Sequence, residues 1–251
     1  MMKLFAANWK MHKTQAEARQ TAEELVRLVG NGLAADREVL LTAPFTALAA
    51  TAQGVAGAAR FSVGAQNFYP ETHGAFTGEI SPAMLQDAGA TWALTGHSER
   101  RHVLGEADGF VGRKTSFGLA AGLSVILCVG EKIEERKGNQ LAEVLTRQIS
   151  LGLADVPRDV SPQRLCVAYE PVWAIGTGLV AGPAEILEAH ALVRSQLTGI
   201  FGNAGREMRI LYGGSVKPDN AAEIIALDNV DGVLVGGASL KADDFSRIVL
   251  A

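Results

Sequence analysis

Cysteine is scarce in this chain, with only Cys128 and Cys166 among 251 residues. Each lies within a short apolar run, where a thiol behaves as a small buried hydrophobic group. A disulfide framework needs more cysteines and usually a smaller domain. We therefore expect a protein of a reducing compartment, the cytoplasm.

A basic excess is also missing, because 23 Lys and Arg face 27 Asp and Glu, for a net charge of -4. This balance argues against nucleic acid and acidic membranes as main partners. One long uncharged stretch, residues 39–59, contains Pro44 and Gln53 and is rich in alanine. We interpret it as a strand and a helix, not as a membrane span. Near the N-terminus, Asn8 and Lys10 interrupt the apolar residues before a signal peptide could form.

Short apolar runs recur along the chain and alternate with longer stretches, several of them with apolar residues at helical spacing. One such stretch ends at Gly30, and Pro82 and Pro183 stand where the first turn of a helix tolerates proline. Strands that alternate with helices predict a parallel sheet, and eight of them predict a (β/α)8 barrel, an α/β fold, as a single domain over residues 1–251. The expected strands are Leu4–Asn8, Glu38–Ala43, Phe61–Gln66, Thr91–Thr95, Ser124–Val129, Arg164–Tyr169, Met208–Tyr212 and Gly232–Val235.

An open doubly wound sheet with a dinucleotide site is the alternative fold. It is disfavoured because no G-x-G-x-x-G follows the first run, where Asn8-Trp9-Lys10-Met11 stands instead. A barrel instead gathers its active-site residues after the carboxyl ends of its strands. Polar residues of catalytic type do follow the expected strands, namely Asn8, Lys10, Asn67, His97, Glu99, Glu170, Gly213-Gly214-Ser215 and Gly236-Gly237.

The stretch from Tyr169 to Gly178 places Glu170 where a strand ends and a loop begins. Pro171 stiffens the first joint of this loop, while Gly176 and Gly178 free its far joint. A stiff apolar segment between two hinges predicts a lid. The alternative is a rim carboxylate paired with an arginine, beside packing residues.

Two glycine pairs after the last two strands, Gly213-Gly214 before Ser215 and Gly236-Gly237, favour a phosphate site, because backbone N–H groups without side chains can approach an anion. Taken singly, each pair is better explained as a tight turn, and the two pairs together with Gly176 favour the phosphate site. His97 follows the fourth expected strand, and Ser98 is expected to cap a helical turn there. A helix N-terminus near the imidazole would keep it neutral and able to donate to a carbonyl oxygen.

Lys10 adds a positive charge to the predicted barrel mouth, either as a functional group or as a partner of Glu99. Arg100 and Arg101 are expected to form ion pairs that hold loops. The long segment Asn67–Ile80 has neither helical nor strand periodicity yet carries aromatic residues, which suggests that it projects into a partner subunit.

Together these motifs resemble the triosephosphate isomerase family over essentially the whole chain. In combination, and in this order, they are highly specific. They are Asn8-Trp9-Lys10-Met11, Gly74-Ala75-Phe76-Thr77-Gly78-Glu79-Ile80-Ser81, Gly96-His97-Ser98-Glu99-Arg100-Arg101, Cys128-Val129-Gly130-Glu131, Tyr169-Glu170-Pro171-Val172-Trp173-Ala174-Ile175-Gly176-Thr177-Gly178, Tyr212-Gly213-Gly214-Ser215-Val216 and Gly232-Val233-Leu234-Val235-Gly236-Gly237-Ala238-Ser239-Leu240.

The resemblance implies a TIM barrel enzyme that interconverts the triose phosphates dihydroxyacetone phosphate and glyceraldehyde 3-phosphate in glycolysis and gluconeogenesis. It implies a cytoplasmic homodimer without cofactor or metal, and a proton transfer through an enediolate, the arrangement known from this family. The implied general base is Glu170 and the implied electrophile is His97, with Lys10 stabilising the oxygen. The implied substrate contacts are Asn8, Lys10, Gly176, Ser215, Gly236 and Gly237, and Thr77 is expected to reach the other subunit's site.

Two other functions remain open on the same residues: a Schiff-base aldolase with Lys10 as nucleophile, and a phosphate-binding scaffold without turnover. Three positions depart from the commoner pattern of the family, namely His12, Thr95 and Leu179. None of them is a predicted catalytic or binding residue. They therefore concern the kinetics of the lid hinge and the affinity for substrate, and not the reaction.

Overall fold

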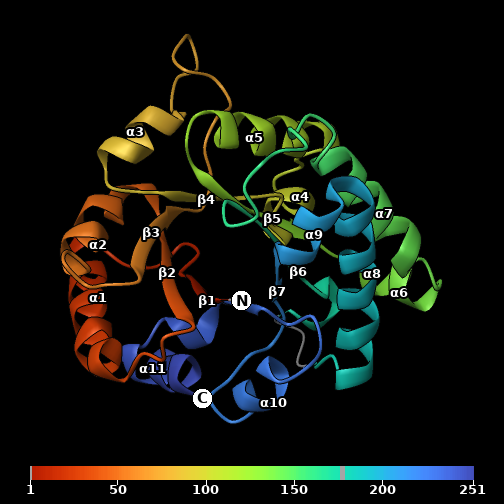
Figure 1. Cartoon of the computed structure of the whole chain (residues 1–251). Helices are drawn as coiled ribbons and strands as arrows, with labels where there is room; N and C mark the ends of the chain where they lie inside the picture. The colour runs from red at the N-terminus through yellow and green to blue at the C-terminus, as the bar shows by residue number, and fades with distance from the viewer. Residues whose placement is uncertain (1, 176–178) are drawn as a thin grey trace.

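The structure is a computed structural model that describes residues 2–175 and 179–251, and it is a closed barrel of eight parallel strands (Figure 1). Neighbouring strands in the chain are neighbours in the barrel, and β1 pairs with β8 to close it. The fold prediction is confirmed, and each expected strand agrees with an observed one to within one residue at either end. The strands are β1 (Lys3–Asn8), β2 (Arg37–Ala43), β3 (Phe61–Ala65), β4 (Trp92–Thr95), β5 (Ser124–Val129), β6 (Leu165–Tyr169), β7 (Arg209–Tyr212) and β8 (Gly232–Val235).

The strands are buried on both faces, so their sequences are almost continuously apolar. In β1, Leu4 and Ala6 point into the barrel, whereas Phe5 and Ala7 point toward the helices, as the period of two requires. The interior is filled by a compact cluster of side chains from seven of the strands. Its members are Leu4, Ala6, Leu40, Trp92, Leu94, Ile126, Cys128, Cys166, Ala168, Leu211 and Leu234.

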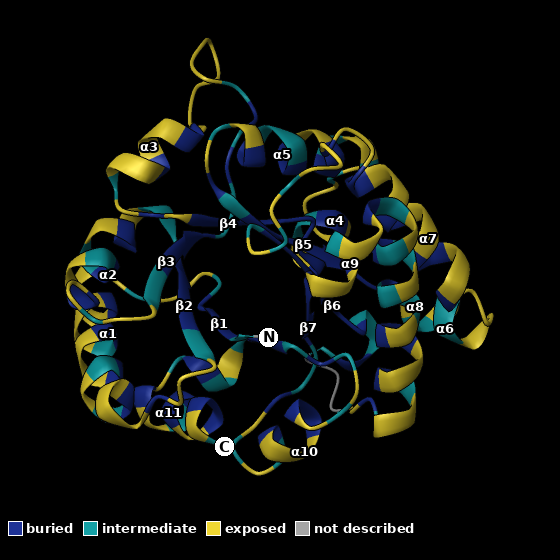
Figure 2. Cartoon of the chain, in the orientation of Figure 1, coloured by how far each residue is buried: buried dark blue, intermediate teal, exposed yellow. Residues whose placement is uncertain are grey.

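Helices surround the barrel, with buried residues toward the strands and exposed residues outside (Figure 2). The α-helices are α1 (Gln15–Val29), α2 (Leu48–Gly54), α3 (Pro82–Asp87), α4 (Ser98–His102), α5 (Asp108–Ala120), α6 (Ile133–Lys137), α7 (Leu141–Gly152), α8 (Pro183–Phe201), α9 (Asn203–Glu207), α10 (Ala221–Ile225) and α11 (Ala242–Leu250). The 3₁₀ turns are η1 (Gly30–Gly32), η2 (Phe45–Ala47), η3 (Val172–Ala174) and η4 (Gly237–Ser239).

Helix starts follow the local signals in the sequence. Thr14 and Glu17 form a capping box at the start of α1, which satisfies N–H groups that have no partner within the helix. Pro82 and Pro183 occupy the first turns of α3 and α8, as predicted. Gly30 follows the last residue of α1, also as predicted, although its backbone stays right-handed.

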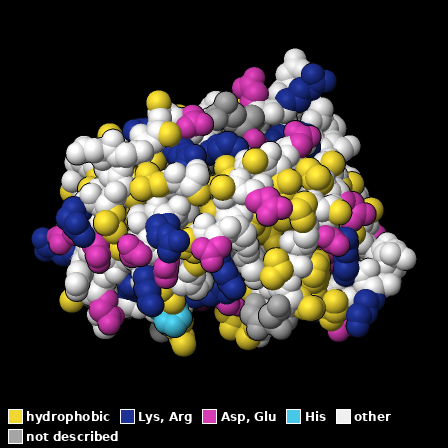
Figure 3. All heavy atoms as spheres, turned by 90° about the horizontal axis from the view of Figure 1, so that it is seen from below, with side chains coloured by type: hydrophobic (Ala, Val, Ile, Leu, Met, Phe, Trp, Pro, Cys, Tyr) yellow, Lys and Arg dark blue, Asp and Glu magenta, His cyan; other side chains and the backbone are white. Residues whose placement is uncertain are grey.

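The uncharged stretch of residues 39–59 forms most of β2, then η2 and α2, which confirms its interpretation as a strand and a helix. Within the part of the chain that the structure describes, no helix is long and apolar enough to span a membrane. On the face seen from below in the view of Figure 1, basic and acidic side chains are interspersed (Figure 3).

Candidate active site

A cavity of about 320 Å³ opens at the carboxyl ends of the strands. Every described residue predicted as catalytic or substrate-binding lines it. Three other residues singled out from the sequence do not line it, namely Asn67, Glu99 and the predicted dimer-loop residue Thr77. The predicted contact Gly176 lies outside the described residues. The lining residues are Asn8, Lys10, His97, Glu170, Ile175, Gly213, Gly214, Ser215, Val216, Lys217, Leu234, Gly236, Gly237 and Ala238.

Glu170 and His97 face each other in this cavity from β6 and β4. The distance from His97 Nε2 to Glu170 Oε1 is 3.0 Å, and the Ser98 N–H donates to Glu170 Oε2 at 2.9 Å. Glu170 is 2% exposed and His97 5%. A carboxylate this deeply buried needs such donors to remain charged. The resting position of Glu170 is therefore fixed by the β4 loop.

The prediction that Ser98 caps the following helix is wrong. The side chain of His97 is the cap of α4, because its Nδ1 accepts the Glu99 N–H at 3.3 Å, and Ser98 is the first helical residue. This places the Ser98 N–H at the start of the helix without an intrahelical partner, where it is available to Glu170.

The two buried groups shift each other's pKa. Burial favours a raised pKa for Glu170, but the adjacent His97, the Ser98 N–H and Lys10 bring the pKa below its usual value. Burial also favours a lowered pKa for His97, but the charge of Glu170 and the hydrogen bond to it bring the pKa above its usual value. The sequence predicted that a helix N-terminus would disfavour the protonated ring, whereas in this arrangement the neighbouring Glu170 favours it. Since His97 Nδ1 accepts a hydrogen bond, the neutral ring carries its proton on Nε2, toward Glu170.

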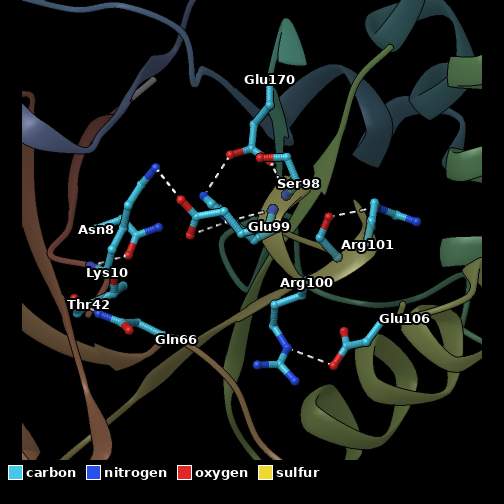
Figure 4. A network of polar contacts seen from close by, with 12 residues as sticks. Asn8, Lys10, Thr42, Gln66, Ser98, Glu99, Arg100, Arg101, Glu106 and Glu170 are labelled. Carbon is cyan, nitrogen blue, oxygen red and sulfur yellow. Dashed lines mark hydrogen bonds and ion pairs between the residues drawn. The ribbon is translucent and has the colours of Figure 1, made fainter. Parts of the chain in front are cut away.

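Lys10 and Asn8 enter the cavity from the end of β1, on the side opposite Glu170 (Figure 4). Lys10 has a positive φ of 51°, and its N–H donates to Asn8 Oδ1 at 3.0 Å. Its Nζ lies 2.7 Å from Glu99 Oε1, so the predicted pairing with Glu99 is present. The ammonium is thereby held at the cavity mouth.

Two arginines support the loop that carries His97, as the sequence predicted. Arg101 is buried, donates to the carbonyl of Gly96 at 2.6 Å and pairs with Asp108. Arg100 Nε lies 2.7 Å from Glu106 Oε1. These contacts connect the end of β4 to α5 and to the loop before α5. The two arginines therefore fix the backbone that carries the His97 imidazole.

At several glycines on one side of the cavity a side chain would meet a neighbouring residue. A Cβ on Gly213 would lie 2.9 Å from Glu170 Cγ, and one on Gly236 would lie 3.3 Å from Lys10 Cε. Ser215 Oγ donates to the carbonyl of Ala174 at 3.1 Å, which connects the β7 loop to η3. Glycine backbone therefore lines this side of the cavity, and its role in binding an anion stays a prediction.

Glu170 is supported by two residues for which the sequence predicted no role, Gly130 after β5 and Gln148 on α7. The Glu170 N–H donates to Val129 O at 2.7 Å, and Gly130 packs directly against the Glu170 backbone. Gln148, buried on α7, holds Gly130 by accepting from its N–H at 2.8 Å and donating to its carbonyl at 3.1 Å. Nothing in the local pattern distinguishes Gln148 from other polar residues of a helix.

Glu131 is a third residue for which the sequence predicted no role. Its carboxylate is fully buried and accepts from Tyr169 Oη at 3.0 Å and from Trp173 Nε1 at 2.7 Å. Burial raises the pKa of Glu131, although these two donors oppose the shift. The contact anchors η3, the described part of the predicted lid, to the end of β5. The lid itself stays a prediction, because residues 176–178 lie outside the described part.

The segment Asn67–Ile80 contains neither helix nor strand and projects from the barrel as a loop (Figure 1). Thr77 is exposed on this loop, away from the cavity of its own chain, and Phe76 is 39% exposed. Among the described residues, no group of three or more His, Cys, Asp or Glu side chains is arranged to hold a metal ion.

Comparisons with known proteins agree with this geometry. The family model described as triosephosphate isomerase matches residues 3–251. A triosephosphate isomerase of Nitratidesulfovibrio vulgaris (strain DP4) is 62% identical over 251 residues, which cover 100% of both chains. One from Chloroflexus aurantiacus is 49% identical and covers 98% of this chain and 97% of its own. The crystal structure of triosephosphate isomerase from Bartonella henselae superposes with a TM-score of 0.88 at 38% identity, covering 99% of this chain and 98% of that one.

Proposed function

The chain belongs to the triosephosphate isomerase family, and from this premise we propose that it interconverts dihydroxyacetone phosphate and glyceraldehyde 3-phosphate within the cavity described above. The observation that carries the proposal is the pair His97–Glu170, 3.0 Å apart in a cavity that is also lined by Lys10 and by glycine backbone. A carboxylate beside a hydrogen-bond donor suits proton abstraction next to a carbonyl group.

In the proposed mechanism, Glu170 removes a proton from the carbon next to the substrate carbonyl. The electron pair of the broken C–H bond forms the enediolate, whose oxygen accepts from His97 Nε2–H and is stabilised by the charge of Lys10. The protonated Glu170 then returns the proton to the neighbouring carbon. His97 Nε2 also passes the hydroxyl proton of the enediol from one oxygen to the other, so the net reaction moves one hydrogen between the two carbons and one proton between the two oxygens, and consumes no other reactant.

The phosphate group is proposed to bind at the glycine-rich side, through Ser215 and the backbone of Gly236 and Gly237, with Gly176 as a further contact. Asn8 and Lys10 are proposed to contact the rest of the substrate. Small residues at these positions leave the amides accessible to an anion, which a net charge of -4 would not attract at long range.

A coupled assay on glyceraldehyde 3-phosphate with wild type and Glu170→Gln tests the proposal. We expect kcat of the variant to fall by roughly 10²- to 10⁴-fold, the usual worth of a general base, with substrate binding largely kept. A matched control is Glu38→Gln, which removes a carboxylate paired with Arg209 at the opposite end of the barrel and should leave kcat unchanged. Binding without turnover by the wild type would contradict the isomerase and favour the phosphate-binding scaffold.

A Schiff-base aldolase on Lys10 is disfavoured by the ion pair of Lys10 with Glu99, because a nucleophilic lysine must lose its charge. Trapping of a substrate adduct on Lys10 by borohydride would support it.

We also propose a homodimer in which the loop Asn67–Ile80 and its exposed Phe76 and Thr77 contact the partner subunit. A monomeric sedimentation profile at micromolar concentration would contradict the dimer. Cys128 and Cys166 are both free and buried, which supports the proposed cytoplasmic location.

A further inference from the structure

The loop between β1 and α1 is strained at Lys10 and again at Lys13. Their φ angles are 51° and 80°, in the left-handed region that residues with a Cβ avoid. The strain at Lys10 brings its side chain into the cavity. Lys13 is absent from the cavity lining, so its strain needs another explanation.

The side chain of Lys13 crosses from this loop to the end of η4. Its Nζ donates to the carbonyl of Leu240 at 2.7 Å and to Thr21 Oγ1 at 2.8 Å, and it lies 5.6 Å from the centroid of the Trp9 ring. Trp9 makes a parallel contact, because its Nε1 donates to the carbonyl of Ser239 at 3.1 Å. Two side chains of the β1 loop therefore hold two consecutive carbonyl groups.

Each of these two carbonyl-bearing residues is hydrogen-bonded in turn to a glycine of the cavity. The Ser239 N–H donates to Gly236 O at 2.8 Å, and the Leu240 N–H donates to Gly237 O at 3.2 Å. Lys13 is thus connected to Gly237 through Leu240, and Trp9 is connected to Gly236 through Ser239. The β1 loop, which presents Lys10, and the β8 loop, which presents the two glycines, are held in one network.

We propose that Lys13 is a positioning residue that sets the Gly236–Gly237 backbone relative to Lys10, so that one ligand can contact the glycine amides and the lysine together. This inference rests on the proposed function, in which the glycines receive the phosphate group. Trp9 is completely buried and fills the space between the two loops, whereas Lys13 acts mainly through its charged end.

Glycine would be the relaxed residue at φ 80°, so Lys13→Gly separates the two explanations of this position. The substitution removes the strain together with the tether. If Lys13 served only the folding of the loop, Lys13→Gly would be at least as stable as wild type and equally active. If Lys13 positions the glycines, affinity for the phosphate group falls while thermal stability is kept.

The experiment measures kcat, KM and the inhibition constant of inorganic phosphate for wild type, Lys13→Gly, Lys13→Met and Lys13→Arg. For the Gly and Met variants we expect KM and the phosphate inhibition constant to rise together by about tenfold, below the roughly hundredfold loss that a 1 Å displacement can cause. We expect a much smaller change in kcat, because Glu170 and His97 are not tethered by this network. Lys13→Arg keeps a cationic donor and should restore most of the affinity.

Lys3→Met is the matched control. Lys3 Nζ also donates to two backbone carbonyls, those of Ile225 at 2.9 Å and Val230 at 3.1 Å, but at the opposite end of β1. Its loss should lower stability without changing KM or phosphate inhibition.

Unchanged KM and phosphate inhibition in both Lys13→Gly and Lys13→Met would overturn the inference. So would a defect in Lys13→Met alone, since that would trace the effect to backbone strain. Should the wild type not turn over, the proposed function fails. Calorimetric titration with inorganic phosphate then still tests the tether: weaker binding in the Gly and Met variants supports it, and equal binding refutes it.

Discussion

Gly130→Ala should separate catalysis from folding, because Gly130 lies against the backbone of Glu170 with no room for a side chain. A Cβ there would be 2.7 Å from the carbonyl carbon of Glu170 and closer still to its oxygen, whereas ordinary contacts begin near 3.4 Å. Gly130 cannot retreat, because Gln148 binds both its N–H and its carbonyl. The overlap must therefore be relieved mainly at Glu170.

We expect Glu170 to move by roughly 1 Å, a displacement that can lower a rate by about 10²-fold. The cost in the free energy of unfolding should be about 1–3 kcal/mol, as for other overpacked sites. The assay is kcat on both triose phosphates, with thermal unfolding to verify that the variant is folded at the assay temperature.

Gly112→Ala is the matched control for this substitution. Its Cβ would overlap the carbonyl oxygen of Leu151, a backbone clash between α5 and α7. It should cost similar stability and leave kcat within about threefold, since none of its neighbours touches Glu170. A folded Gly130→Ala with kcat as high as that of Gly112→Ala would refute the reasoning.

Two further predictions concern buried polar groups. Gln148→Met leaves the N–H and carbonyl of Gly130 buried without partners, so urea unfolding should show a loss of about 2–4 kcal/mol in the free energy of unfolding. The kcat should also fall, because Gly130 supports Glu170. A variant as stable as wild type would contradict this prediction. Burial lowers the pKa of His190 to about 4 from an ordinary 6.5. Between these two pH values the unfolded state therefore binds a proton on His190 and the folded state does not. Stability should therefore fall as the pH decreases from 6.5 to 4, by up to about 3 kcal/mol, and His190→Gln should remove this part of the slope in urea unfolding measured at pH 4, 5, 6 and 7.

The barrel could be predicted from the sequence because its strands are buried on both faces. Such strands appear as short continuous apolar runs separated by helical stretches, and β5 and β8 begin and end where these runs do. The strand ends then fix which residues meet in the cavity, so Lys10, His97 and Glu170 could be grouped before any distance was known.

Contacts between residues without a local signature could not be predicted in this way. Gln148 lies in the middle of a helix, and only the packing of α7 on β5 brings it to Gly130. The sequence predicts Ser98 as a cap, whereas the imidazole of His97 caps α4. Lys13 also shows no sequence signal, because its left-handed backbone and its reach to Leu240 depend on closure between β1 and β8.

The resting contact between His97 and Glu170 bears on how the proposed mechanism begins. The single Nε2 proton of a neutral His97 is directed at Glu170, and the proposed substrate carbonyl needs that same donor. Substrate binding therefore has to separate the pair. Once Glu170 leaves, His97 loses the largest of the charges that raise its pKa, and burial then favours the neutral ring. Glu170 in turn loses the donors that lower its pKa, so burial raises its pKa and makes it a stronger base. One movement thus brings both groups toward the protonation behaviour that their proposed roles require.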